Sequence, residues 1–216
     1  MRIGFFGGSF DPPHLGHLAV ARRAAQAFSL DRVLFAPTAR QPFKTNGLVA
    51  SYVDRFAMLV LLCNLEPAAE THRYEPSHLD APLPNDAPNF TVDTLKRLRD
   101  QLSPNDSIFA IVGADAFQGL PMWRSPELLL NLADWIVVSR PGSSAQDVET
   151  LDVTPFQMQR IHWLDGVDEP ASATEIRSLL MRGSDCSGLL PACILEYIRA
   201  HHLYRAHPPI LNSDAP

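Results

Sequence analysis

The residues best suited to chemistry lie near the start of this sequence, in the segment Gly-Phe-Phe-Gly-Gly-Ser-Phe-Asp-Pro-Pro-His-Leu-Gly-His at positions 4–17. Its histidines, His14 and His17, are three residues apart, a spacing that puts them on one face of a helix. Imidazoles donate hydrogen bonds and carry positive charge when protonated. The pair Gly7 and Gly8 lets the backbone approach a ligand closely, and the N–H groups at a helix start suit phosphate. This segment therefore indicates a site for a phosphorylated ligand.

A second candidate group lies late in the chain, where Ser172 and Thr174 precede Arg177. Arg177 lies one turn into a predicted helix, from which it can reach back over an anion held at the helix start. Ser172 also has capping-box spacing to Glu175, so an ordinary helix start is the alternative interpretation.

A third candidate group follows an apolar run that ends at Gly113 and is followed by Asp115. A carboxylate at the carboxyl end of a strand can accept two ribose hydroxyls. A cap on a short following helix is the alternative, and spacing alone leaves the two about even. Asp11 precedes two prolines, and we expect it to be the N-cap of the first helix.

The elements that must position these residues alternate between apolar, β-rich runs and helical patterns. The predicted strands are Ile3–Phe6, Arg32–Ala36, Ile108–Gly113, Trp135–Ser139 and Ile161–Leu164. The predicted helices are His14–Phe28, Tyr52–Leu65, Val92–Gln101, Thr174–Met181 and Pro191–His201. This alternation predicts an α/β fold, a Rossmann-like doubly wound parallel sheet with C-terminal helices, whose ligand crevice lies at the carboxyl ends of the strands. The dehydrogenase fingerprint Gly-x-Gly-x-x-Gly is absent after the first strand, which argues against hydride transfer.

Composition narrows the class of protein. The 216 residues fit one domain over residues 1–205, followed by a disordered tail at 206–216. The net charge of −6 argues against nonspecific nucleic-acid binding. Three scattered cysteines are typical of reduced thiols in the cytoplasm. The sequence shows no signal peptide and no apolar run long enough to cross a membrane, and it leaves a homo-oligomer open.

The string Gly-Gly-Ser-Phe-Asp-Pro-x-His-x-Gly-His resembles the signature of the nucleotidyltransferase superfamily with the H-x-G-H motif. From Met1 to about Tyr204, the chain resembles the bacterial nicotinate mononucleotide adenylyltransferases. The resemblance implies that His14, His17 and Arg177 are catalytic groups near the ATP phosphates. It also implies that further residues bind ATP, namely Gly7, Gly8, Ser9, Phe10, Gly113, Asp115, Ser172 and Thr174.

For the second substrate, the resemblance implies a mononucleotide subsite made of Lys44, Thr91, Trp123 and Arg124. A pyridinium ring stacks well on the indole of Trp123, and a carboxylate matches the N–H groups near Thr91 and Arg124. Lys44 would hold the mononucleotide phosphate. Without the resemblance, a core position for Trp123 and a solvated surface position for Lys44 are the simpler interpretations. Arg55 also matches the family, and a salt bridge along its helix would explain it.

The implied reaction joins nicotinate mononucleotide to the adenylyl group of ATP and releases pyrophosphate. Mg²⁺ would arrive bound to ATP, and we expect no metal site built from protein side chains. One alternative is an adenylyl- or cytidylyltransferase that prefers nicotinamide mononucleotide or another phosphorylated acceptor. The other is a nucleotide-binding regulator without catalysis. The intact trio of His14, His17 and Arg177 argues against the regulator.

Overall fold

The computed structural model describes residues 1–42, 48–67, 73–139, 154–166 and 172–205. Its centre is a six-stranded sheet in which every neighbouring pair of strands is parallel. The strands, in chain order, are β1 (Arg2–Gly8), β2 (Arg32–Pro37), β3 (Tyr74–Pro76), β4 (Ser107–Gly113), β5 (Asp134–Val138) and β6 (Ile161–Leu164). Their spatial order, β3-β2-β1-β4-β5-β6, reverses direction between β1 and β4, which is where ligands bind in such sheets.

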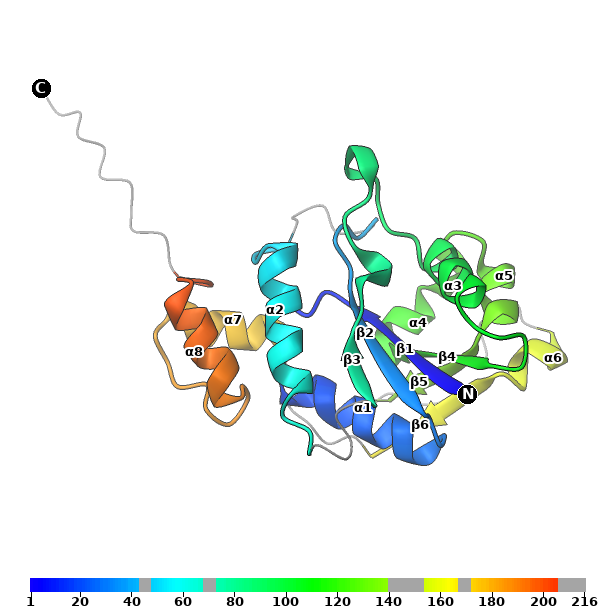
Figure 1. Ribbon diagram of the computed structural model, residues 1–216, viewed down its shortest axis with the longest axis horizontal. Coiled ribbons are helices and arrows are strands. Elements are labelled where there is room, and N and C mark those ends of the chain that lie inside the picture. Colours follow the sequence, from blue (N-terminus) through cyan, green and yellow to red (C-terminus); the bar gives the residue numbers. More distant parts are fainter. Residues whose placement is uncertain (43–47, 68–72, 140–153, 167–171, 206–216) are drawn as a thin grey trace, which may run out of the picture.

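Successive strand residues point to opposite sides of the sheet, and an apolar cluster buries each of the two faces. On β1, Ile3 and Phe5 belong to one apolar cluster, whereas Phe6 belongs to the other. The first cluster includes side chains from α3, α4 and α5, and the second includes side chains from α1, α2, α7 and α8. The fold therefore has three layers, with the sheet in the middle (Figure 1).

The longer helices are α1 (Leu15–Ala27), α2 (Tyr52–Cys63), α3 (Thr91–Asp100), α7 (Ala173–Met181) and α8 (Ala192–Ala200). Short helical segments complete the described chain, namely α4 (Ala114–Gln118), α5 (Pro126–Leu132), α6 (Pro155–Met158), η1 (His78–Asp80), η2 (Pro84–Asp86) and η3 (Leu120–Met122). Figure 1 shows α7 and α8 beside α2, on the side of the molecule away from α3. The hydroxyl of Tyr197 on α8 donates a hydrogen bond to Asp54 on α2, at 3.0 Å.

The predicted α/β class, the parallel sheet and the five predicted strands are confirmed. The sixth strand, β3, escaped prediction because it has three residues, of which the last is a proline. The predicted N-cap at Asp11 is wrong, because two prolines separate it from the helix and His14 occupies the cap position. The predicted tail at 206–216 lies outside the described residues. Within the described chain, no helix combines the length and apolarity needed to span a membrane.

Candidate active site

A cavity of about 440 Å³ opens at the carboxyl ends of β1, β2 and β4. Its lining combines glycine backbone, aromatic side chains and a few polar groups. It is formed by Phe5, Phe6, Gly7, Gly8, Thr38, Gln41, Pro42, Asp80, Asn89, Phe90, Thr91, Ala110, Ile111, Val112, Gly113, Asp115, Ala116, Gly119, Trp123, Arg124, Leu129 and Trp135. An apolar pocket with few, converging polar groups is typical of small-molecule sites.

One end of the cavity is the turn between β1 and α1, where glycine is needed on steric grounds. A Cβ added to Gly7 would lie 2.9 Å from the Phe5 ring, and one added to Gly8 would lie 3.2 Å from the Phe10 ring. Phe10 follows in the left-handed region, at φ 48°, with its side chain buried. Its ring packs edge-on against Phe6, at a centroid distance of 5.5 Å, and against His17, at 4.8 Å. Phe10 therefore supports the turn from within the core.

The two histidine rings lie close together at the start of α1. Their ring centroids are 3.8 Å apart, and the rings are tilted by 33°. The backbone N–H of His14 donates to Nδ1 of His17, at 3.2 Å. In a neutral ring that accepts at Nδ1, the proton resides on Nε2. This contact therefore makes Nε2 of His17 a hydrogen-bond donor even without protonation.

Asp11 is a buried junction between distant parts of the chain. Its carboxylate accepts from the backbone N–H groups of Val49 and Ala50, at 2.7 and 3.1 Å. The hydroxyl of Tyr204 donates to the same carboxylate, at 2.6 Å. Burial, reinforced by the neighbouring Asp11, raises the pKa of Tyr204. Asp11 is therefore a structural anchor for the turn.

Arg55 braces the same turn from α2. Its guanidinium is 1% exposed and donates to the carbonyls of Ser9, at 2.6 Å, and Ala50, at 3.3 Å. Burial lowers the pKa of Arg55, and the nearby Asp11 acts in the opposite direction. Arg55 thus has a structural role, but the described partners of its guanidinium are carbonyls of the preceding segments and not a carboxylate on its own helix. Ser9 is also held through its hydroxyl, which accepts from the side chain of Gln41 at 3.1 Å.

The late group that includes Arg177 meets the early segment directly. The Arg177 guanidinium donates to the carbonyl of Asp11, at 2.7 Å, and to the hydroxyl of Thr174, at 3.2 Å. Ser172 occupies the N-cap position of α7 but makes no capping hydrogen bond through its side chain. The capping-box alternative is therefore not realised, and the hydrogen bond from Arg177 to Asp11 joins two segments that lie 166 residues apart in the sequence.

At the other end of the cavity lie Thr91, Trp123 and Arg124, three of the residues predicted for the second substrate. Thr91 is the first residue of α3, where backbone N–H groups lack partners within the helix. Trp123 is half-buried and meets Trp135 edge-on, at a centroid distance of 6.1 Å. Arg124 lies over the Phe90 ring at 4.8 Å and contacts Asp93 at 3.4 Å. An aromatic face, a helix start and a cation thus converge on one wall.

Gly113 and Asp115 border the cavity between these two ends. Gly113 is the N-cap of α4, whereas Asp115 lies within the first turn with an exposed side chain. The capping alternative for Asp115 is therefore wrong. Its carboxylate lies at the cavity, beside the end of β4.

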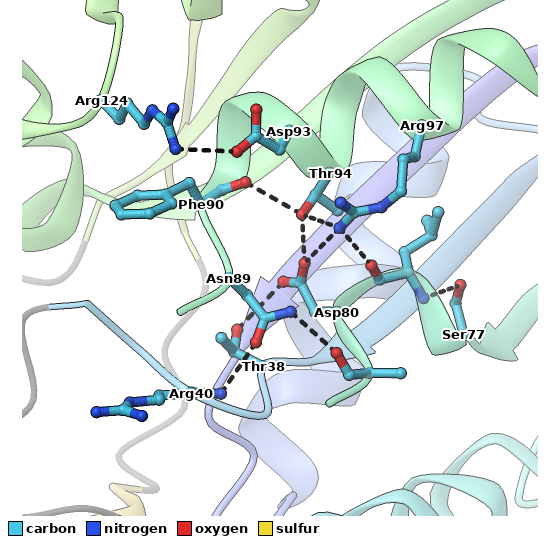
Figure 2. Close-up of polar contacts among 12 residues, drawn as sticks. Thr38, Arg40, Ser77, Asp80, Asn89, Phe90, Asp93, Thr94, Arg97 and Arg124 are labelled. Carbon is cyan, nitrogen blue, oxygen red and sulfur yellow. Dashed lines mark hydrogen bonds and ion pairs between the residues drawn. The ribbon is translucent and has the colours of Figure 1, made fainter. Parts of the chain in front are cut away.

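Sequence reasoning missed a polar network on the cavity wall, shown in Figure 2. Asp80 is 5% exposed and accepts from the hydroxyls of Thr94 and Thr38, the latter at 3.3 Å. Asn89, 4% exposed, bonds to the backbone of Arg40 and to the carbonyl of Ala81. Asp80 and Asn89 lie in a proline-rich segment without a regular hydrophobic period, so the sequence pattern did not indicate that they are buried or which residues they contact.

The cavity thus gathers part of the predicted site. The predicted residues that line it are Gly7, Gly8, Thr91, Gly113, Asp115, Trp123 and Arg124. Those outside its lining are Ser9, Phe10, His14, His17, Ser172, Thr174 and Arg177. Lys44 lies outside the described residues. Within the part of the chain that is described, no three His, Cys, Asp or Glu side chains come together as a metal site requires.

Comparison with known proteins agrees with this architecture. The model of the family described as "Cytidylyltransferase-like" matches residues 5–179. Among solved structures, Plasmodium falciparum nicotinic acid mononucleotide adenylyltransferase complexed with NaAD superposes with a TM-score of 0.74 at 17% identity. That match covers 94% of this chain and 97% of the other, and it concerns the fold.

Curated relatives match nearly end to end. Proteins named "Probable nicotinate-nucleotide adenylyltransferase" are 38% identical in Solibacter usitatus, over 94% of this chain and 100% of that protein, and 40% identical in Thermus thermophilus, over 95% and 100%. A relative of the same name in Pseudomonas aeruginosa is 35% identical, over 95% of this chain and 98% of its own. The protein therefore belongs to the cytidylyltransferase-like family of nucleotidyltransferases and, within it, to the nicotinate-nucleotide adenylyltransferases.

Proposed function

We propose that this enzyme transfers the adenylyl group of ATP to nicotinate mononucleotide, giving nicotinate adenine dinucleotide and pyrophosphate. One observation carries the proposal most directly. A single cavity runs from the glycine turn at Gly7 and Gly8 to the wall formed by Thr91 and Trp123. A phosphate-binding turn and a ring-binding wall in one cavity fit a reaction that joins two nucleotides. The names of the close relatives support the same substrate.

We assign the ATP phosphates to the glycine turn and the neighbouring donors. Gly7, Gly8 and Ser9 would form the floor, with backbone N–H groups facing phosphate oxygens. His17 would donate from Nε2, which the contact at Nδ1 leaves as the protonated nitrogen. His14 would lie near the same phosphates, since the centroids of the two rings are 3.8 Å apart.

Arg177 would act on the leaving pyrophosphate, because its hydrogen bond to Asp11 docks α7 on this turn. Ser172 and Thr174, at the start of the same helix, would contact the triphosphate. Asp115, together with the backbone of Gly113, would bind the adenosine, with the carboxylate accepting ribose hydroxyls.

The mononucleotide would occupy the opposite end of the cavity. Its electron-poor ring would stack on Trp123, and its carboxylate would meet N–H groups near Thr91 and Arg124. Lys44 would pair with the mononucleotide phosphate.

The chemistry follows from this placement. A phosphate oxygen of the mononucleotide attacks the α-phosphorus of ATP, a new P–O bond forms, and the bond between the α-phosphorus and its bridging oxygen breaks. Pyrophosphate leaves with the electron pair of that bond. The attacking oxygen is already anionic, so the main obstacle is repulsion between two anions, and catalysis is alignment plus charge stabilisation. ATP enters as its Mg²⁺ complex, in which the ion neutralises part of the triphosphate charge.

We further propose that residues 1–205 act as one domain and that the enzyme works in the cytoplasm. Cys63, Cys186 and Cys193 are free thiols in the structure, which suits a reducing compartment.

The test is an assay of the purified protein with ATP and Mg²⁺, in which nicotinate and nicotinamide mononucleotides are compared at equal concentrations. Released pyrophosphate and the dinucleotide product are both measured. The proposal expects higher kcat/KM with nicotinate mononucleotide and no turnover when CTP replaces ATP. A preference for nicotinamide mononucleotide, or for phosphopantetheine as acceptor, would reassign the substrate. Tight ATP binding without product from any acceptor would favour a regulator.

A further inference from the structure

Asp80 is a buried carboxylate on the cavity wall to which the proposed reaction assigns no role. It ends η1, is 5% exposed and lines the cavity beside Thr38 and Asn89. Taking a carboxylate out of water is costly unless hydrogen bonds and charges compensate. An apolar residue would fill the same space without this desolvation cost, so the carboxylate at this position points to a specific role.

The partners of Asp80 come from two different walls of the cavity. Thr38 follows the end of β2 and donates to Oδ2 at 3.3 Å, while Thr94, in the first turn of α3, donates to Oδ1. Arg97, one turn further along α3, donates to the Thr94 hydroxyl at 3.1 Å and lies 3.9 Å from the carboxylate. Figure 2 shows Asp80 between these side chains. The carboxylate therefore ties the start of α3 to the carboxyl end of β2.

Asn89 makes a second tie between the same walls. Its side-chain oxygen accepts from the backbone N–H of Arg40 at 3.0 Å, and its side-chain nitrogen donates to the carbonyl of Ala81 at 3.0 Å. Its own backbone N–H donates to the carbonyl of Arg40 at 2.9 Å. Asn89 lies two residues before Thr91, so the start of α3 is held both before and after that residue.

We propose that Asp80 is a positioning residue for the mononucleotide subsite, acting through Thr94 to hold Thr91 and the start of α3 against the loop after β2. This inference rests on the proposed function, because it takes Thr91 to be part of that subsite. Burial raises the pKa of Asp80, while the Thr94 and Thr38 hydroxyls and Arg97 oppose the shift. The two hydroxyls hold the Asp80 side chain between the two walls, and loss of either hydroxyl loosens one wall.

The charge of Asp80 and its positioning role would affect KM for the mononucleotide in opposite directions, so one substitution can distinguish them. Both reactants are anions, so a carboxylate on the wall repels them. If Asp80 acted on the substrate only through its charge, Asp80→Asn would lower KM for the mononucleotide. If Asp80 acts by positioning, the same change raises that KM.

The experiment compares Asp80→Asn, Thr94→Val and Thr94→Ser with a matched control, Asp134→Asn. Asp134 is also a partly buried carboxylate with an arginine partner, Arg160 at 3.3 Å, but it lies at the amino end of β5 and is not part of the cavity lining. Asp80→Asn and Thr94→Val are expected to raise KM for nicotinate mononucleotide about tenfold, with KM for ATP changed less than about twofold. Thr94→Ser keeps the hydroxyl and should restore KM, and the control should match wild type.

Two results would overturn the inference. One is an equal rise in KM for both substrates, or a rise in the control, which would make the network a general structural feature. The other is a fall in KM for the mononucleotide. If Asp80→Asn does not fold, the Thr94→Val and Thr94→Ser pair carries the test. A wild-type protein that makes no dinucleotide refutes the proposed function instead, so the two failures are distinguishable.

Discussion

Trp123→Ala gives the most direct test of the ring-binding wall. The indole lines the cavity, is half-buried and contacts Trp135 by its edge at 6.1 Å, so the substitution removes a face open to a ligand. An aromatic pair contributes about 0.5–1.5 kcal/mol beyond area burial, and a cation over indole adds about 0.5–2 kcal/mol, more when water is excluded. Since Trp123 is only half-buried, we take a total of about 1.4 kcal/mol, which corresponds to a tenfold change in affinity.

The expected result is therefore a rise of about tenfold in KM for nicotinate mononucleotide, with KM for ATP nearly unchanged. The assay varies one substrate while the other is saturating, and follows pyrophosphate release. Calorimetric titration with the mononucleotide accompanies it, because KM equals Kd only when chemistry is slow relative to dissociation. Trp123→Phe keeps an aromatic face and should lie between alanine and wild type.

The matched control is Trp163→Ala. Trp163 lies on β6, also half-buried against the same apolar cluster, but it is not part of the cavity lining. Its loss should lower stability without separating the two KM values. If Trp123→Ala raises both KM values equally, or if Trp163→Ala gives the same pattern, the tryptophan serves packing and the proposed subsite is wrong.

Three further outcomes are expected. His17→Ala should lower kcat on the order of 10²–10³-fold in a folded protein, as loss of one preorganised donor does, and near-normal steady-state rates would remove His17 from the mechanism. Tyr204→Phe removes a hydroxyl that donates to the buried Asp11 carboxylate, so the free energy of unfolding in a urea titration should fall by about 1.5–3 kcal/mol. An unchanged midpoint of urea unfolding would show that the hydrogen bond from Tyr204 to Asp11 does not stabilise the fold. Because the folded pKa of Tyr204 is raised above the ordinary value of about 10, its contribution to stability is complete below that pH and declines above it. Wild type should therefore lose stability more steeply than Tyr204→Phe above about pH 10, and parallel curves would refute this.

The parts of the fold that could be predicted are those with a repeating physical signal. Strands buried on both faces appear as apolar runs, and the longer helices show a regular apolar stripe, so the parallel sheet and its crevice followed from the sequence. The glycine turn was also predictable, because a close backbone approach leaves a local signature at Gly7 and Gly8. Pairing of β3 had no such signal, since its three residues end in Pro76 and only the neighbouring β2 fixes its place.

The residues that escaped prediction act through contacts between distant segments. Asp11 looked like a helix cap because capping is the commonest local use of an aspartate before prolines. In the structure its carboxylate is instead occupied by the N–H groups of Val49 and Ala50 and by the hydroxyl of Tyr204. Asp80 and Asn89 were missed for the same reason, since their hydrogen-bond partners lie 8 to 49 residues away in the sequence.

This arrangement gives the C-terminal helices a role that their position in the sequence does not indicate. Arg177 bonds to the carbonyl of Asp11, and Tyr204 bonds to its carboxylate, so one residue of the early turn receives contacts from two late segments. Arg55 on α2 holds the carbonyl of Ser9 in the same turn. A rigid turn keeps its donors fixed as charge develops during phosphoryl transfer, which is the condition for preorganised stabilisation. We infer that α7 and the segment after α8 complete the turn that we propose to bind phosphate, so a disturbance at Tyr204 should reach kcat through Asp11 without touching substrate.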